Sequence, residues 1–84
     1  MENKIKILVG DDSAENGVMI ANFLRSEGFS AVTRQKDGLA IFETIKTEMP
    51  DIVIVDSVLP HLDAIELIKK VNSSVYKKPK FIVS

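Results

Sequence analysis

The chain has no cysteine, a single histidine and no long hydrophobic run. Without cysteine it can form neither disulfides nor thiolate metal sites, which agrees with a cytoplasmic protein. No stretch reaches the roughly 18 consecutive apolar residues that a membrane-spanning helix needs. The first six residues lack the apolar core of a secretory signal. We therefore expect a cytoplasmic protein without membrane contact.

Net charge is also nearly absent. Eleven basic and twelve acidic residues leave a formal charge of −1, which offers no general attraction for nucleic acid. We expect no direct nucleic-acid contact by this segment. The one local bias is a group of lysines, which is interpreted as a solvated helix end and loop or, alternatively, as a docking patch for an acidic partner. The group comprises Lys69, Lys70, Lys77, Lys78 and Lys80.

With 84 residues, the chain forms one small domain at most. Runs in which apolar residues alternate with polar ones, or follow one another without a break, alternate with runs in which apolar residues recur every three or four positions. They predict strands over 4–10, 29–34, 52–56 and 81–84, and helices over 14–27, 39–48 and 64–72. Helices between successive strands are typical of a parallel sheet with right-handed crossovers. The predicted class is α/β, a doubly wound parallel sheet in the order βαβαβαβ.

Apolar spacing also predicts which face of each helix packs on the sheet. Three sets of side chains are expected to point inward. They are Val18, Ile20, Ala21, Phe23 and Leu24 in the first helix, Leu39, Ile41, Phe42 and Ile45 in the second, and Ile65, Ile68 and Val71 in the third.

Three aspartates follow two of the predicted strands. Asp11 and Asp12 end the first strand, and Asp56 ends the β-branched run 52–55. If those strands are neighbours, the three carboxylates converge at the carboxyl edge of the sheet, where open α/β sheets place their ligands. Such a hard, oxygen-only set suits Mg²⁺. The alternative is that Asp11 and Asp12 only cap a helix, while Asp56 only ends a strand.

These motifs carry a family resemblance. ILVGDDS near the start, a KDG turn, IVIVD followed by LPHLD, and FIVS at the end resemble the receiver domain of bacterial two-component response regulators. The similarity runs through the whole chain in order, and the separation of 44 residues between Asp12 and Asp56 is typical of the family. The PHLD run is similar to the sporulation master regulators of endospore-forming Firmicutes. The resemblance implies a flavodoxin-like receiver fold.

The resemblance also implies a role for each site residue. Asp56 would be the phosphoacceptor, taking a phosphoryl group from a sensor histidine kinase or a phosphotransfer partner. Mg²⁺ would be held by Asp12, Asp56 and the backbone carbonyl of Val58, with Asp11 acting largely through water. The Ser84 hydroxyl would hydrogen-bond the phosphoryl group and move with it. The domain would not be a turnover enzyme, and a DNA-binding or effector module would follow residue 84.

One departure from the family is large. A complete receiver continues with a helix, a fifth strand that ends on a lysine, and a last helix, and residues 1–84 contain none of these. We therefore expect a partial receiver domain in which no residue near the rim replaces that lysine. Strand 81–84 would be an open apolar edge. The alternative is a natively short chain that buries this surface in a homodimer or a strand-exchanged oligomer.

Two other functions are compatible with the same residues. A receiver-like module without the lysine could act by dimerising, with no phosphorylation. A metal-dependent phosphatase could use Asp56 as its nucleophile. Such enzymes usually place a second acid two residues after the nucleophile, where this chain has Val58, so the phosphatase is the weakest hypothesis.

Overall fold

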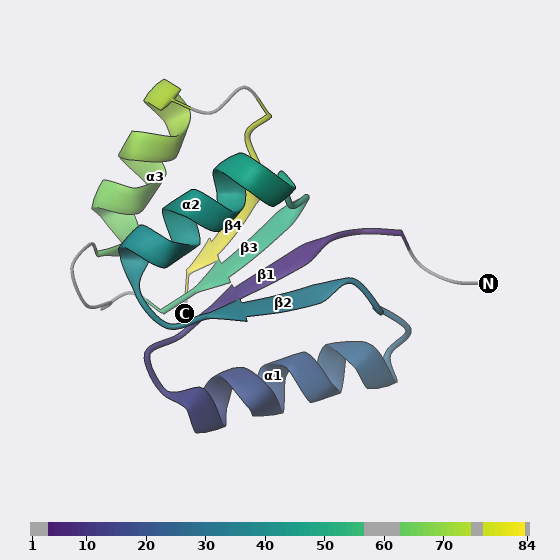
Figure 1. The fold of residues 1–84 in the computed structure, drawn as a ribbon. Helices are drawn as coiled ribbons and strands as arrows, with labels where there is room; N and C mark the ends of the chain where they lie inside the picture. Colours follow the sequence, from purple (N-terminus) through teal and green to yellow (C-terminus); the bar gives the residue numbers. More distant parts are fainter. Residues whose placement is uncertain (1–3, 57–62, 75–76, 84) are drawn as a thin grey trace.

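Helices and strands alternate along the chain as predicted. The computed structural model describes residues 4–56, 63–74 and 77–83. Its elements, shown in Figure 1, are β1 (Ile7–Gly10), α1 (Ala14–Ser26), β2 (Val32–Gln35), α2 (Gly38–Glu48), β3 (Ile52–Val55), α3 (Ala64–Ser74) and β4 (Lys80–Val83). Within the described ranges, no helix is long and apolar enough to cross a membrane.

The strands form one parallel sheet in the order β2-β1-β3-β4. This is the strand order of flavodoxin-like folds, in which the direction of winding reverses between β1 and β3. Gly10 at the end of β1 is in register with Gln35 of β2 and with Val55 of β3. The three strands therefore end level at one edge of the sheet. The predicted doubly wound fold is confirmed.

The helices cover the two faces unequally. Figure 1 shows α1 alone on one face and α2 with α3 on the other. Successive residues of β1 point to opposite faces, so Leu8 joins the core under α2 and α3, and Ile7 and Val9 join the core under α1. Burying each of these side chains contributes about 1.5–3 kcal/mol. The sheet is thus held from both sides.

Helix α1 packs on the sheet through small residues. Gly17 and Ala21 are buried and Leu24 is partly buried, a spacing that places all three on one helix face. The prediction that Val18 and Phe23 point inward is wrong, because their exposures are 40% and 63%. With α1 as the one described helix on this face, no second helix covers the flanks where these two side chains lie.

The predicted inner faces of α2 and α3 also need correction. Leu39 is 50% exposed and Ile65 is 68% exposed, whereas Ala64 and Leu67 are fully buried. The sequence of α3 offers two adjacent apolar faces, one that begins with Ile65 and one that carries Leu67 and Val71. Contact with α2 buries the face that carries Leu67 and Val71. Periodicity alone does not decide between adjacent stripes.

Strand β2 begins later than predicted because the end of α1 uses the preceding residues. Gly28 has φ +100 and its N–H donates to Arg25 O, while Phe29 N–H donates to Leu24 O at 3.0 Å. This pair of bonds is a Schellman motif, which closes a helix on a left-handed glycine. Phe29 therefore belongs to the helix end, and its ring packs against the core under α1.

The lysine group is partly used inside the domain. Lys77 Nζ pairs with Asp51 Oδ1 at 2.7 Å. Lys70 Nζ lies 5.2 Å from the centre of the Phe42 ring, and Lys46 Nζ lies 4.7 Å from it. These contacts connect α2 with α3 and tie the segment before β4 to β3.

Asp51 holds three strands together at the amino edge of the sheet. Its Oδ2 accepts a hydrogen bond from Lys6 N at 2.8 Å, and Lys80 N donates to its backbone carbonyl at 2.9 Å. The hydrogen bond from Lys77 is the largest cause that holds the pKa of Asp51 below its usual range, followed by that from Lys6 N. A carboxyl group whose pKa is lower in the folded state stabilises the fold most when it is ionised.

We expect Asp51→Asn to lower the melting temperature at pH 7, because the amide cannot replace the charge beside Lys77. The difference from the wild type should shrink as the pH falls below about 4, where the unfolded chain binds the proton first. Thermal unfolding at several pH values between 7 and 3 measures this. Glu43→Gln, which removes an exposed pair with Lys46, serves as the control with little expected effect. A difference that stays constant over this pH range would contradict the assignment.

Candidate functional site

The three aspartates singled out in the sequence do meet. Each of Asp11, Asp12 and Asp56 offers a carboxylate oxygen, and these oxygens all lie within 4.8 Å of one another. Asp11 is buried, Asp56 is half-buried and Asp12 is exposed. The cluster lies at the carboxyl edge of the sheet, at the reversal point between β1 and β3. The predicted convergence is therefore confirmed.

Backbone pairing carries the sheet one residue beyond its strands and positions two of the acids. Asp56 N donates to Gly10 O at 2.9 Å, and Asp11 N donates to Gln35 O at 3.1 Å. The Asp11 carboxylate is fixed as well, because its Oδ1 accepts from Ser13 N at 2.9 Å. Two of the three acids thus stand on hydrogen-bonded backbone.

The helix that follows Asp12 is capped by Ser13. Ser13 Oγ accepts from Asn16 N at 3.2 Å, in the geometry of a helix N-cap. The sequence left open that Asp12 takes this role. Because Ser13 takes it, the Asp12 carboxylate is left to the cluster.

The charges of the cluster need a cation. Two like charges at about 4 Å repel each other by about 1 kcal/mol in water and by about 4 kcal/mol at an effective dielectric constant of 20. A divalent ion among the carboxylates reverses the sign of this interaction. The donor set is oxygen only, with one exposed side that leaves room for water, which fits Mg²⁺ better than a soft metal.

Two predicted site residues lie outside the described ranges. They are Val58, whose backbone carbonyl was expected to bind the metal, and Ser84, whose hydroxyl was expected to bind the phosphoryl group. Their roles stay predictions.

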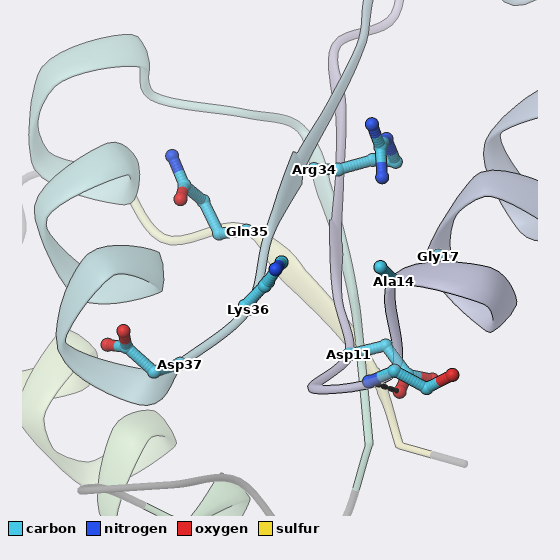
Figure 2. A pocket seen from close by; sticks show the side chains of 8 residues that line it. Asp11, Ala14, Gly17, Arg34, Gln35, Lys36 and Asp37 are labelled. Carbon is cyan, nitrogen blue, oxygen red and sulfur yellow. Dashed lines mark hydrogen bonds between the residues drawn. The ribbon is translucent and has the colours of Figure 1, made fainter.

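Two cations that share a cavity with Asp11 were not predicted. Arg34 and Lys36, at and just after the end of β2, line a cavity that Asp11 also lines. Figure 2 shows Arg34 on the α1 side of β2 and Gln35 on the other side, as strand alternation requires. We expected that no residue near the rim replaces the lysine of the family, and no site residue was predicted at the end of this strand. Pairing of Gly10 with Gln35, which makes β1 and β2 end at the same edge, is the feature that places Arg34 and Lys36 there.

Gly10 lets helix α2 lie close to this edge. A methyl group on Gly10 would clash with Ile41 Cδ1, and it would lie 3.1 Å from Ile41 Cγ1 and 3.3 Å from Val55 Cγ1. Ile41 is completely buried, so it has little room to move away. A glycine directly before the acid pair is therefore a packing requirement.

Comparison with known proteins agrees with this geometry. A family model described as the response regulator receiver domain matches residues 7–84. The chain is 35% identical over 67 residues to the alkaline phosphatase synthesis transcriptional regulatory protein PhoP of Bacillus subtilis, covering 80% of this chain and 28% of that protein. The family-model match, over residues 7–84, includes both strands that deliver the acidic cluster.

Two further proteins are similar to this chain, one in sequence and one in structure. A protein-glutamate methylesterase/protein-glutamine glutaminase of Halalkalibacterium halodurans is 35% identical over 74 residues, 87% of this chain and 21% of that protein. The chemotaxis response regulator CheY4 of Vibrio cholerae superposes with a TM-score of 0.86 at 26% identity, covering 96% of this chain and 68% of that one. The chain spans less than a third of the length of the curated relatives described.

We expect Gly10→Ala to lower the free energy of unfolding by about 1–3 kcal/mol, the usual cost of overpacking a core. Urea unfolding measures the loss. The matched control is Gly17→Ala, where the added methyl would lie 3.7 Å from Arg34 Cδ, an ordinary contact distance. Because alanine is the better helix former, the control should gain up to about 1 kcal/mol. Equal effects at both glycines would show that packing against Ile41 is not the cause.

Proposed function

The chain belongs to the response regulator receiver domain family, and on this premise we propose that Asp56 is the residue that accepts the phosphoryl group. Receiver domains are phosphoacceptor signalling domains of two-component systems, and so is this one. The narrower similarity to sporulation regulators stays a prediction. The proposal for Asp56 is supported above all by its position in the acidic cluster.

The three acids differ in what they can do. Asp11 is buried and its Oδ1 already accepts from Ser13 N. Asp12 is exposed at the outer side, next to the helix cap. Asp56 is half-buried on a central strand, with β1 on one side of β3 and β4 on the other. An oxygen of Asp56 would attack phosphorus, the bond to the donor's leaving group would break, and an aspartyl phosphate would result.

Receiver domains bind Mg²⁺ at an acidic cluster of this kind, and the cluster is present here. We propose that Asp12, Asp56 and the Val58 carbonyl hold the ion directly, and that Asp11 acts through water. When bound, Mg²⁺ offsets charge on the transferring group. Because Ser13 N donates to Asp11 Oδ1, the Asp11 carboxylate would keep its position beside the metal while Asp56 reacts.

The donor and the output are further parts of the proposal. A sensor histidine kinase or a phosphotransfer protein would supply the phosphoryl group in the cytoplasm. The receiver itself would not turn over a substrate. One relative carries the name of a methylesterase, but we propose no methylesterase activity for residues 1–84. We also propose that these residues make no direct contact with nucleic acid. We propose that these residues form part of a receiver domain, which is supported by their covering 68% of the CheY4 chain.

We expect the protein to take up phosphate from a small phosphodonor, or beryllofluoride, in a Mg²⁺-dependent reaction that Asp56→Asn abolishes. Intact-mass spectrometry measures phosphate uptake. Asp63→Asn is the matched control, since Asp63 Oδ1 accepts from Glu66 N at 2.9 Å and asparagine caps helices equally well. Uptake that survives Asp56→Asn would remove this residue from the assigned role.

A second candidate function is a dimerising module that works without phosphorylation. The observation in its favour is strand β4, where Ile82 is 47% exposed and Val83 is 49% exposed. An apolar edge strand of this kind pairs readily with another chain. Light scattering would then give a dimer mass in the Asp56→Asn variant, and Ile82→Lys would convert it to a monomer. A monomer mass before substitution would exclude this function.

A further inference from the structure

A cavity of about 310 Å³ separates the first half of α1 from the end of β2. It exists because Ala14 and Gly17, three residues apart on one face of α1, have no side chain long enough to fill it. The stem of Arg34 passes over Gly17, 3.7 Å from where a methyl group would be. The volume is at the lower end of the range of about 300–1,000 Å³ that is usual for ligand pockets, so the cavity suits a small molecule.

The cations on its wall are unpaired, whereas the carboxylates are engaged. Among the contacts of the described residues, neither Arg34 nor Lys36 forms an ion pair or a side-chain hydrogen bond. Asp37 Oδ1 accepts from Ala40 N at 2.9 Å and caps α2, and Asp11 Oδ1 accepts from Ser13 N. The charged groups on this wall without a described partner are therefore the positive ones.

The start of α1, where Ala14 lines the opposite wall of the cavity, adds further donors. Asn16 N and Gly17 N donate to Ser13, but in the described part of the chain no hydrogen bond is made by the N–H groups of Ala14 and Glu15. Unsatisfied N–H groups in the first turn carry the positive end of the helix dipole. This second feature favours negative charge independently of the two side chains.

We propose that this cavity is a binding site for a small phosphate-bearing anion. Arg34 offers a planar fork of N–H donors that matches phosphate oxygens, and Lys36 offers a mobile point charge. Figure 2 shows the side chains of Arg34 and Lys36 on the wall that faces Ala14 and Gly17 across the cavity. The site is separate from Asp56 and does not depend on phosphoryl transfer to it.

Asp11 couples this site to the acidic cluster, because it belongs to both. Without a cation, the cluster opposes an incoming anion. With Mg²⁺ bound, that repulsion is reduced, so phosphate should bind more tightly when Mg²⁺ is present, and Mg²⁺ more tightly when phosphate is present.

The test is a titration of ¹⁵N-labelled protein with inorganic phosphate in the presence of Mg²⁺, with sodium chloride at matched ionic strength as the reference. We expect saturable shifts of the Gly17 and Lys36 amide signals. The double variant Arg34→Met, Lys36→Met keeps the side-chain stems and should weaken phosphate binding at these signals by at least about tenfold, since it removes both charge-assisted contacts. Lys69→Met, another exposed lysine, should change it less than twofold.

Lys36→Met alone, at an exposed side chain without described contacts, repeats the test if the double variant melts early, with an expected loss of about threefold or more. Equal phosphate affinity in the wild type and in these variants would overturn the proposal. So would shifts confined to the Asp12 and Asp56 amides, which would place the anion on the metal. Phosphate uptake on Asp56 is measured separately, so either proposal can fail alone.

Discussion

The in-register parallel pairing of β1 with β3 is the constraint on which the rest of this structure depends. Gly10 lies opposite Val55, and the next residue of each strand is an aspartate. Any slip of the register would move one carboxylate away from the other. Because the strands are parallel, their ends cannot be joined by a short turn, and the connecting segment contains α1, β2 and α2. Packing of α2 against β1 then requires glycine at position 10.

The charged groups at the two edges of the sheet are arranged differently. At the amino edge, Asp51 is matched by Lys77 and by the Lys6 N–H, so charge there stabilises the fold. At the carboxyl edge, three acids gather with their carboxylate oxygens within 4.8 Å of one another. Like charges placed together lower stability, and such local conflicts are typical of functional sites. The charges that stabilise the fold thus lie at the amino edge of the sheet, and the candidate functional site lies at the carboxyl edge.

The carboxyl edge is also where small residues concentrate. Gly10 admits Ile41 on one face, while Ala14 and Gly17 leave a cavity on the other. The space at Gly10 is filled by Ile41 of the protein's own core, whereas the space at Ala14 and Gly17 stays open. The helix cost of Gly17, about 1 kcal/mol relative to alanine, had no explanation from the sequence. In the structure it accompanies a space lined by unpaired cations.

The sequence by itself determined the order of elements and the parallel sheet, because these follow from local periodicity and from the geometry of parallel strands. It placed Asp11, Asp12 and Asp56 at strand ends, and the pairing of β1 with β3 decided that they meet. It did not determine which stripe of α3 is buried, since Ile65 and Leu67 differ only in the neighbour that each would meet. Nor did it place Arg34 and Lys36 on the cavity that Asp11 lines. Only tertiary structure decided these points, because they depend on the register of β2 and on contacts between helices far apart in the chain.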